Sequence, residues 1–154
     1  MSFRVQCYDA FSGLGPGERI ALVNFIHRSS EEEDRGVIRE AIDYALKNKP
    51  SFGGFIFVCW QERRPIACVL VNKTGMSGFL PSHLLVYASL DKEFHGQPEI
   101  LDDLVRKTTR RCKGEVALHL KPDSPSLPLF QALGFQEHYV ELRFNNQVSL
   151  SSAS

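Results

Sequence analysis

Apolar side chains along this chain follow two patterns, short continuous runs and stripes that recur every three or four residues. Continuous runs at residues 55–61 and 66–72 are typical of strands covered on both faces, and the short polar connection between them predicts an antiparallel hairpin. Four further segments are rich in β-branched or aromatic residues and are predicted to be strands, namely residues 2–8, 83–90, 116–120 and 135–144. The pattern therefore predicts a sheet with two deeply buried strands.

Two helices are predicted between the first strand and the hairpin. Residues 16–29 carry apolar side chains at helical spacing, with Ile20 on the expected buried face and a proline suited to an early helical position. Ser30 then offers an oxygen cap, and the acidic run 31–34 suits the positive end of a second helix, whose expected buried face includes Val37. The acidic run is thus interpreted as helix-dipole chemistry rather than as a metal site.

Two more helices are predicted in the second half of the chain. An amphipathic stripe begins near Ile100 and runs to about Cys112, where Gly114 supplies the usual cap. A short helix opens at residues 122–125 and ends at Ala132, just before another glycine. The element order β-α-α-β-β-β-α-β-α-β predicts a mixed α/β fold with helices on both faces of one sheet.

The composition suits one globular domain. Of the 154 residues 43% are apolar and 23% are charged, which is ordinary for a folded domain, so we expect residues 1–144 to form that domain and residues 145–154 to be a polar tail. Eighteen basic and eighteen acidic side chains leave no net field to attract nucleic acid or an anionic membrane. No apolar stretch reaches the ~18 residues of a membrane span. Neither nucleic acid nor a membrane is therefore expected as a partner.

The cysteines are widely spaced, with no C-x-x-C pair and no histidine at zinc-finger spacing; they are Cys7, Cys59, Cys68 and Cys112. A metal site is therefore not expected. Two of the four lie inside apolar runs, where free cysteine usually acts as a small buried hydrophobe rather than as a reactive thiol. Reduced thiols fit a cytoplasmic location.

The stretches FIFVCWQERRPIACVLV, HLLVYASLDKEFHGQPEILDDLV and DSPSLPLFQALGFQE carry a resemblance that covers nearly the whole chain. Together with the element order, they resemble the Gcn5-related N-acetyltransferase (GNAT) superfamily. The resemblance implies a mixed, mostly antiparallel sheet and transfer of an acetyl or other short acyl group from a coenzyme A (CoA) thioester to an amine. In the third stretch, Phe130 stands where the family commonly has a tyrosine that protonates the departing thiolate, and phenylalanine has no hydroxyl to donate.

The second stretch resembles the family's strand-to-helix loop, in which backbone amides hold the CoA diphosphate. The family's glycine pattern falls here on HGQPEI, residues 95–100, and only Gly96 of the usual glycines is present. Pro98 deletes one N–H donor, and Glu99 places a carboxylate where an anion would sit. Ile100 adds a branched side chain. The positions that the resemblance assigns to acyl-CoA are Leu90, Asp91, His95, Gly96, Gln97, Glu99, Ile100 and Phe130.

These departures leave two hypotheses of different class. One is an N-acyltransferase that binds acetyl-CoA or another acyl-CoA weakly, with Lys92, His95 or Arg106 offsetting the acidic groups. The other is a non-catalytic binding or regulatory module of the same fold whose CoA site has decayed. Each lost charge-assisted phosphate contact costs on the order of 1.5–3 kcal/mol, so two or three losses move a micromolar site beyond millimolar. The acceptor would be a small-molecule or peptide amine, and a homodimer is left open.

Three side chains are candidates for proton transfer. An amine must lose its proton before it attacks, and His83, at the start of a predicted inner strand, is the first candidate base. His119 is the second, and Tyr87, whose spacing places it on the same strand face as His83, is a candidate for the acid that Phe130 lacks. Each also has a simpler interpretation, as a strand-end or half-buried histidine or as a core aromatic residue.

Overall fold

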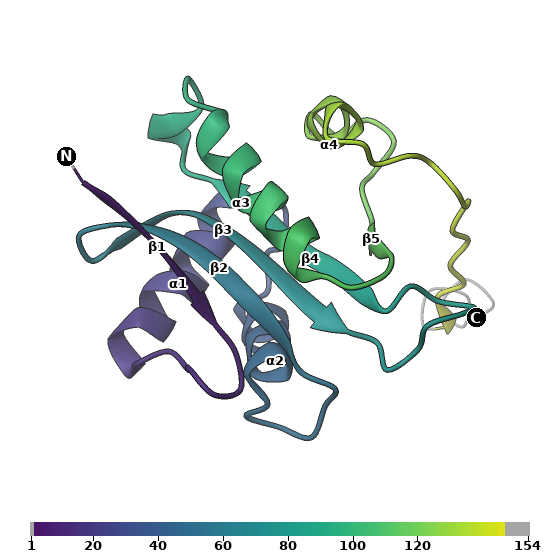
Figure 1. The fold of residues 1–154 in the computed structure, drawn as a ribbon, viewed down its shortest axis with the longest axis horizontal. Coiled ribbons are helices and arrows are strands. Elements are labelled where there is room, and N and C mark those ends of the chain that lie inside the picture. Colours follow the sequence, from purple (N-terminus) through teal and green to yellow (C-terminus); the bar gives the residue numbers. More distant parts are fainter. Residues whose placement is uncertain (1, 147–154) are drawn as a thin grey trace, which may run out of the picture.

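The computed structural model describes residues 2–146, and within them the chain forms one five-stranded sheet, four α-helices and a short 3-10 helix, η1 (Lys92–Phe94) (Figure 1). The strands are β1 (Phe3–Tyr8), β2 (Gly54–Gln61), β3 (Arg64–Lys73), β4 (His83–Leu90) and β5 (Val116–Leu118). The helices are α1 (Pro16–Ser29), α2 (Arg35–Leu46), α3 (Glu99–Arg111) and α4 (Leu127–Ala132). The strands lie in the order β1-β2-β3-β4-β5, and all neighbours are antiparallel except β4 and β5.

The central strands separate two hydrophobic clusters. In β2, Ile56 and Val58 face a cluster shared with α1 and α2, whereas Phe55 and Cys59 face a second cluster shared with α3. A strand with helices on both faces has no solvent side, which explains why β2 and β3 are apolar at nearly every position. The predicted fold class, a mixed and mostly antiparallel sheet with helices on both faces, is confirmed.

A buried polar connection ties the edge strand β1 to β2 and α1. The indole Nε1 of Trp60 donates to the hydroxyl oxygen of Tyr8 at 3.0 Å, and both side chains are almost fully buried. The same hydroxyl lies 3.1 Å from the carboxylate of Glu18, which also accepts a hydrogen bond from the Gly15 N–H at the start of α1. Buried tryptophan and tyrosine need such partners for their polar atoms.

The strand β4 contains one extra residue. Leu70 of β3 pairs with Tyr87, but the next residue, Val71, pairs with Leu85, so Val86 has no partner on β3. A bulge of this kind shifts the alternation of side chains between the two faces. Leu85 accordingly packs in the cluster on the α3 side, whereas Tyr87 packs against the cluster on the α1 and α2 side.

The strands β4 and β5 pair over a short distance only. The paired residues are His83 with Val116, Leu84 with Ala117 and Leu85 with Leu118. Beyond Leu85, no other strand of the described chain pairs with this side of β4, and Figure 1 shows the chain after β5 leading to α4, apart from α3. The free edge of β4 thus begins at the bulge.

The predicted start of the second helix is wrong. Helix α2 begins at Arg35 because the carboxylate of Asp34 accepts a hydrogen bond from the Gly36 N–H at 2.7 Å. Ser30 instead ends α1, where its N–H donates to the carbonyl oxygen of Ile26. The acidic run is therefore mostly the connection between the two helices.

Ile20 and Val37, both expected on buried helix faces, are exposed at 64% and 43%. The buried residues of α1 are Leu22, Val23, Phe25 and Ile26. At ~100° per residue, Ile20 lies opposite the centre of that group, and Val37 lies at the margin of the buried face of α2. The apolar stripe of each helix is narrower than the sequence pattern suggested.

The predicted strand at residues 135–144 is also wrong, since the structure assigns no strand to this segment, and the strand expected at 116–120 ends at Leu118. A strand requires a partner as well as a suitable sequence, and the three-residue β5 offers a short edge. In the segment that was expected to be the polar tail, residues 147–154 lie outside the described part of the chain.

Candidate functional site

The free edge of β4 leads directly into the loop before α3. From Val86 onward, the main chain of β4 has a strand partner on the β3 side only, within the described residues. An extended ligand can pair with such an edge as an additional strand. One acceptor on this strand is already used, because a ring nitrogen of His95 lies 3.2 Å from the carbonyl oxygen of Leu90.

The loop between β4 and α3 uses some backbone N–H groups internally and leaves others without partners. The N–H groups of His95, Gln97 and Ile100 donate to the carbonyl oxygens of Lys92, Phe94 and Gln97. Among residues 2–146, those of Gly96, Glu99 and Leu101 find no acceptor. No heavy atom lies within 4 Å of the position that a Cβ on Gly96 would take, so the backbone is accessible there. Free N–H groups at a helix start are suited to an anion.

Asp91 fixes the position of this loop. Its buried carboxylate accepts a hydrogen bond from the Glu93 N–H at 3.0 Å, lies 3.1 Å from the guanidinium of Arg64 and lies 3.6 Å from that of Arg28. Burial alone would raise the pKa of Asp91, but the Glu93 N–H and Arg64 outweigh it, so the pKa is lowered. Its own N–H donates to the Ile66 carbonyl oxygen. The carboxylate therefore holds the loop in place and is already paired.

Acidic groups surround the free amides. Glu99 is exposed at the first position of α3, and Oδ1 of Asp102, one turn further, is buried without a hydrogen-bond donor among the described residues. A carboxylate oxygen in this position disfavours an anion at the helix start by charge repulsion. Ile100, in contrast, is half-buried and packs against the α3-side cluster, so the core accommodates its branched side chain.

Tyr87 lies on the α1 and α2 side of β4, one residue beyond the bulge, and is half-buried. Burial, with a further contribution from the Glu32 carboxylate in the α1–α2 connection, raises the pKa of Tyr87 to about 12. The phenol therefore keeps its proton at neutral pH and is able to donate it.

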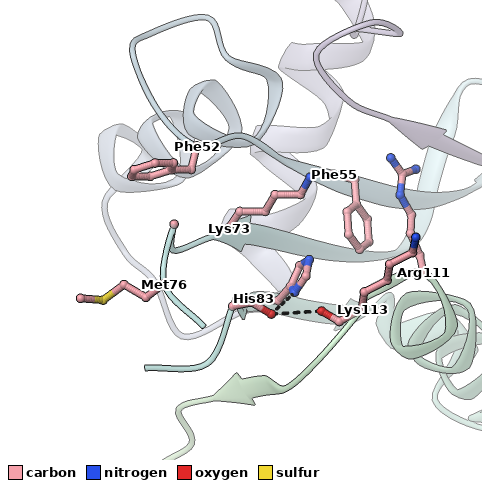
Figure 2. Close-up of a pocket in the computed structure, with 9 residues that line it drawn as sticks. Phe52, Phe55, Lys73, Met76, His83, Arg111 and Lys113 are labelled. Atoms are coloured by element: carbon pink, nitrogen blue, oxygen red, sulfur yellow. Dashed lines mark hydrogen bonds between the residues drawn. The ribbon is translucent and has the colours of Figure 1, made fainter. Parts of the chain in front are cut away.

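His83 lies in a different place, a hollow of about 490 Å³ on the α3 side of the sheet (Figure 2). A ring nitrogen of His83 lies 2.8 Å from the hydroxyl of Ser82, which also donates to the carbonyl oxygen of Lys113. Figure 2 shows the side chain of Lys73 reaching toward Phe55, with the imidazole of His83 below it. Burial, and then the charge of Lys73, lower the pKa of His83 and favour the neutral ring.

The structure does not bring His83 and Tyr87 together. The expectation that they share a strand face is wrong because the extra residue Val86 shifts the alternation between them. His83 is also at the far end of the strand from the loop, since seven residues of a strand span about 23 Å.

No family model matches this chain, and no curated protein matches it. Solved structures do match. The aminoglycoside N-acetyltransferase AAC(6')-Iy in complex with CoA superimposes with a TM-score of 0.67 at 13% identity, over 95% of each chain. The GNAT family acetyltransferase SP0256 from Streptococcus pneumoniae TIGR4 gives 0.63 at 10% identity, over 94% of this chain and 99% of that chain. A chain of the NatC complex bound to Gag peptide and CoA gives 0.63 at 15% identity, over 90% and 87%.

The chain has the GNAT fold. The resemblance carried by the three sequence stretches is thereby confirmed at the level of the fold. The matching structures include acetyltransferases, one of them described as a GNAT family protein, and the AAC(6')-Iy and NatC structures contain CoA. At these identities the likeness concerns the architecture of the chain.

The GNAT-like stretch around Phe130 has a structural explanation in this chain. Gly134 adopts a φ of +105°, which lets the chain reverse so that the Phe135 N–H donates to the carbonyl oxygen of Phe130 at 3.0 Å. The two rings meet edge to face with centroids 5.4 Å apart, and Phe130 is almost fully buried in the α3-side cluster. The spacing thus builds a helix end, and Phe130 contributes packing.

His119 lies just beyond β5 and is exposed. Its Nε2 is 3.2 Å from a carboxylate oxygen of Glu141, in the segment after α4. The structure therefore places the three candidate proton-transfer residues in three separate surroundings, and it joins His119 to a segment that the sequence assigned to a strand.

Reasoning from the sequence missed two residues that hold the loop before α3 through Asp91. Arg28 on α1 and Arg64 at the start of β3 both pair with Asp91, although their sequence positions are far apart. A buried acid after an inner strand signals a need for cationic partners, but spacing alone does not identify them. Residues 2–146 contain no group of three or more metal-ligating acids, histidines or cysteines, and no helix in that range combines the length and apolar character of a membrane span.

Proposed function

We propose that the protein is a GNAT-type N-acyltransferase that moves an acetyl or short acyl group from a CoA thioester to an amine. The observation that supports this most directly is the continuity of two features, the free edge of β4 and the partnerless N–H groups of the loop that follows it. Both are main-chain features, so they persist where side chains of the motif have changed.

In this proposal the CoA diphosphate binds at the N–H groups of Gly96, Glu99 and Leu101, and the pantetheine arm pairs with the free edge of β4. The arm then leads from the loop toward Val86, where the bulge begins. Such a path places the thioester beside Tyr87. His95 has to release the Leu90 carbonyl oxygen if the arm is to use that acceptor.

The proposed acyl transfer uses the protonated phenol of Tyr87. The amine nitrogen attacks the thioester carbonyl, the carbon–sulfur bond breaks, and the sulfur takes a proton while the nitrogen loses one. Because the pKa of Tyr87 is about 12, the hydroxyl is present as a donor for the sulfur and is not a base near neutral pH. His83 lies on the other face of the sheet, so we assign removal of the amine proton to water.

A non-catalytic binding module is the second candidate. The contact of His95 with the Leu90 carbonyl oxygen and the unpaired, buried oxygen of Asp102 favour it, because both oppose CoA at this edge. In that case the fold would be retained while the thioester site is closed.

Two measurements distinguish these functions. Thermal unfolding with increasing CoA or acetyl-CoA tests binding, since a ligand of the native state raises the midpoint with its concentration. Release of free thiol from acetyl-CoA in the presence of polyamines, aminoglycosides and peptides with free N-termini tests transfer. Thiol release that depends on the amine supports the enzyme. No midpoint shift at millimolar CoA, together with no thiol release, refutes it and favours the module.

A further inference from the structure

The segment between α4 and residue 146 carries a row of exposed apolar side chains. Tyr139, Val140, Leu142 and Phe144 are exposed at 90%, 88%, 90% and 75%. Their spacing is that of a strand with two unlike faces, since Val140, Leu142 and Phe144 alternate with Glu141 and Arg143. The described chain provides no strand partner for this segment. Single exposed apolar residues are common, but a contiguous apolar face of this kind indicates an interaction surface.

The segment is complementary to itself. If two copies pair antiparallel about a two-fold axis at Leu142, then Glu141 of each copy lies opposite Arg143 of the other. The two resulting ion pairs lie next to each other on one face of the ribbon, with their acidic and basic members in opposite order. On the other face, Leu142 meets its own copy and Val140 lies opposite Phe144. Every directly opposed pair from 140 to 144 is therefore favourable.

Neighbouring registers lack this complementarity. An axis at Glu141 sets two carboxylates opposite each other, and an axis at Arg143 sets two guanidinium groups opposite each other. A shift by one residue turns the apolar face of one copy to the charged face of the other. Of these registers, the sequence of the segment favours the axis at Leu142.

The protein's own sheet is a poorer partner for this segment. Glu141 contacts His119, just beyond β5, and also Arg143 of its own chain, but within the described residues the segment forms no ladder with β5. A two-stranded ribbon needs cover on its apolar face to be stable in water. Half-buried apolar side chains at the margin of the α3-side cluster, on β5 and around α4, offer that cover: Leu118, Leu120, Leu133 and Phe135.

We propose that residues 140–144 form an antiparallel strand pair with the same residues of a second copy of this chain, with the two-fold axis at Leu142. The pairing gives the backbone its missing hydrogen bonds and brings six exposed apolar side chains together on one face. It is independent of whether the protein transfers an acyl group.

A symmetric cross-link tests the register. Opposed residues of an antiparallel pair have Cα atoms about 4.5–5.5 Å apart, within the range of a disulfide. Under mild oxidation, Leu142→Cys should give a covalent dimer on a non-reducing gel. The matched control is Tyr139→Cys, equally exposed but six residues from its own copy across the axis, about 20 Å in a strand. Cross-linking of both variants to the same extent, or of neither, overturns the proposal; the unsubstituted chain gives the baseline for Cys7.

Charge reversal tests the contacts in solution. Sedimentation of the unsubstituted protein should show a monomer–dimer equilibrium, and Glu141→Arg or Arg143→Glu should each weaken the dimer roughly tenfold by opposing like charges. The double variant Glu141→Arg with Arg143→Glu should restore it. A monomer at all concentrations, or a double variant as weak as the singles, overturns the pairing. Circular dichroism confirms that each variant is folded.

Discussion

His83 and Tyr87 face opposite sides of the sheet although only three residues separate them on β4. The ring of His83 is tilted against that of Phe55, with centroids 6.5 Å apart, on the α3 side, whereas Tyr87 packs toward α1 and α2. The unpaired residue Val86 between them produces this change of face. One short strand therefore presents a neutral imidazole to one layer and a protonated phenol to the other.

The proposed role of Tyr87 predicts a loss of turnover in Tyr87→Phe. Loss of a general acid lowers rate by about 10²–10⁴-fold, so kcat for acetyl transfer should fall by at least about 100-fold. CoA binding should not change, because the ring remains. Steady-state kinetics and the CoA-dependent thermal midpoint measure the two effects. His83→Gln, on the opposite face of the same strand, is the matched control and should retain kcat; an active Tyr87→Phe enzyme would rule out the assignment.

The acidic groups at the start of α3 predict a gain in CoA affinity when they are neutralised. Charges next to a helix terminus contribute about 0.3–1 kcal/mol each, so Glu99→Gln with Asp102→Asn should tighten CoA binding by roughly 3- to 30-fold. Isothermal titration calorimetry measures the change. Glu40→Gln on α2 removes a negative charge elsewhere and should leave the affinity unchanged. Equal affinity in the double variant and the unsubstituted protein would contradict binding at these amides.

The buried contact between Trp60 and Tyr8 predicts a stability change. Tyr8→Phe leaves the indole N–H of Trp60 without its acceptor, and an unsatisfied buried donor costs about 1–3 kcal/mol. Urea denaturation should show a decrease of that size in the free energy of unfolding. Tyr139→Phe removes the hydroxyl of an exposed tyrosine and should have no measurable effect on monomer stability. Similar stability of the two variants would show that the indole finds another acceptor.

The environment of His83 predicts a dependence of stability on pH. Burial and the charge of Lys73 lower the pKa of His83 in the folded state, relative to about 6.5 in the unfolded chain. At pH values between the folded and unfolded pKa, the unfolded state therefore binds more protons than the folded state. The free energy of unfolding should therefore decrease as pH falls below about 6.5. His83→Gln removes this term, and its stability relative to the unsubstituted protein should increase from pH 7.5 to pH 5.5. A difference that does not change with pH would contradict a lowered pKa.

The sequence predicts the layers of this fold well because they follow from periodicity. The runs around Phe55 and Val69 are apolar on both faces, and this property requires central strands with helices on each side. Periodicity does not reveal an unpaired residue such as Val86, so the relative faces of His83 and Tyr87 were predicted wrongly.

The candidate site could be predicted in part. The loop from Leu90 to Ile100 follows from the resemblance, and the structure places it between β4 and α3. The pairing of Asp91 with Arg28 and Arg64 depends on contacts between segments distant in sequence, which spacing does not encode. The segment at 135–144 has the alternation of a strand, but alternation does not specify which edge, in which copy, a strand will join.

The ion pairs of Asp91 make the rigidity of the loop before α3 depend on salt. In a glycine-rich loop, tight backbone packing sets the shape; here one carboxylate shared by Arg28 and Arg64 contributes much of the restraint. Both guanidinium groups are partly open to solvent, so added salt weakens their attraction to the carboxylate, most strongly when the screening length falls from about 8 Å at physiological salt to about 3 Å at 1 M. Concentrated salt should therefore loosen the turn before α3, detectable as faster amide hydrogen exchange, while the hydrophobic layers on either side of the sheet stay intact.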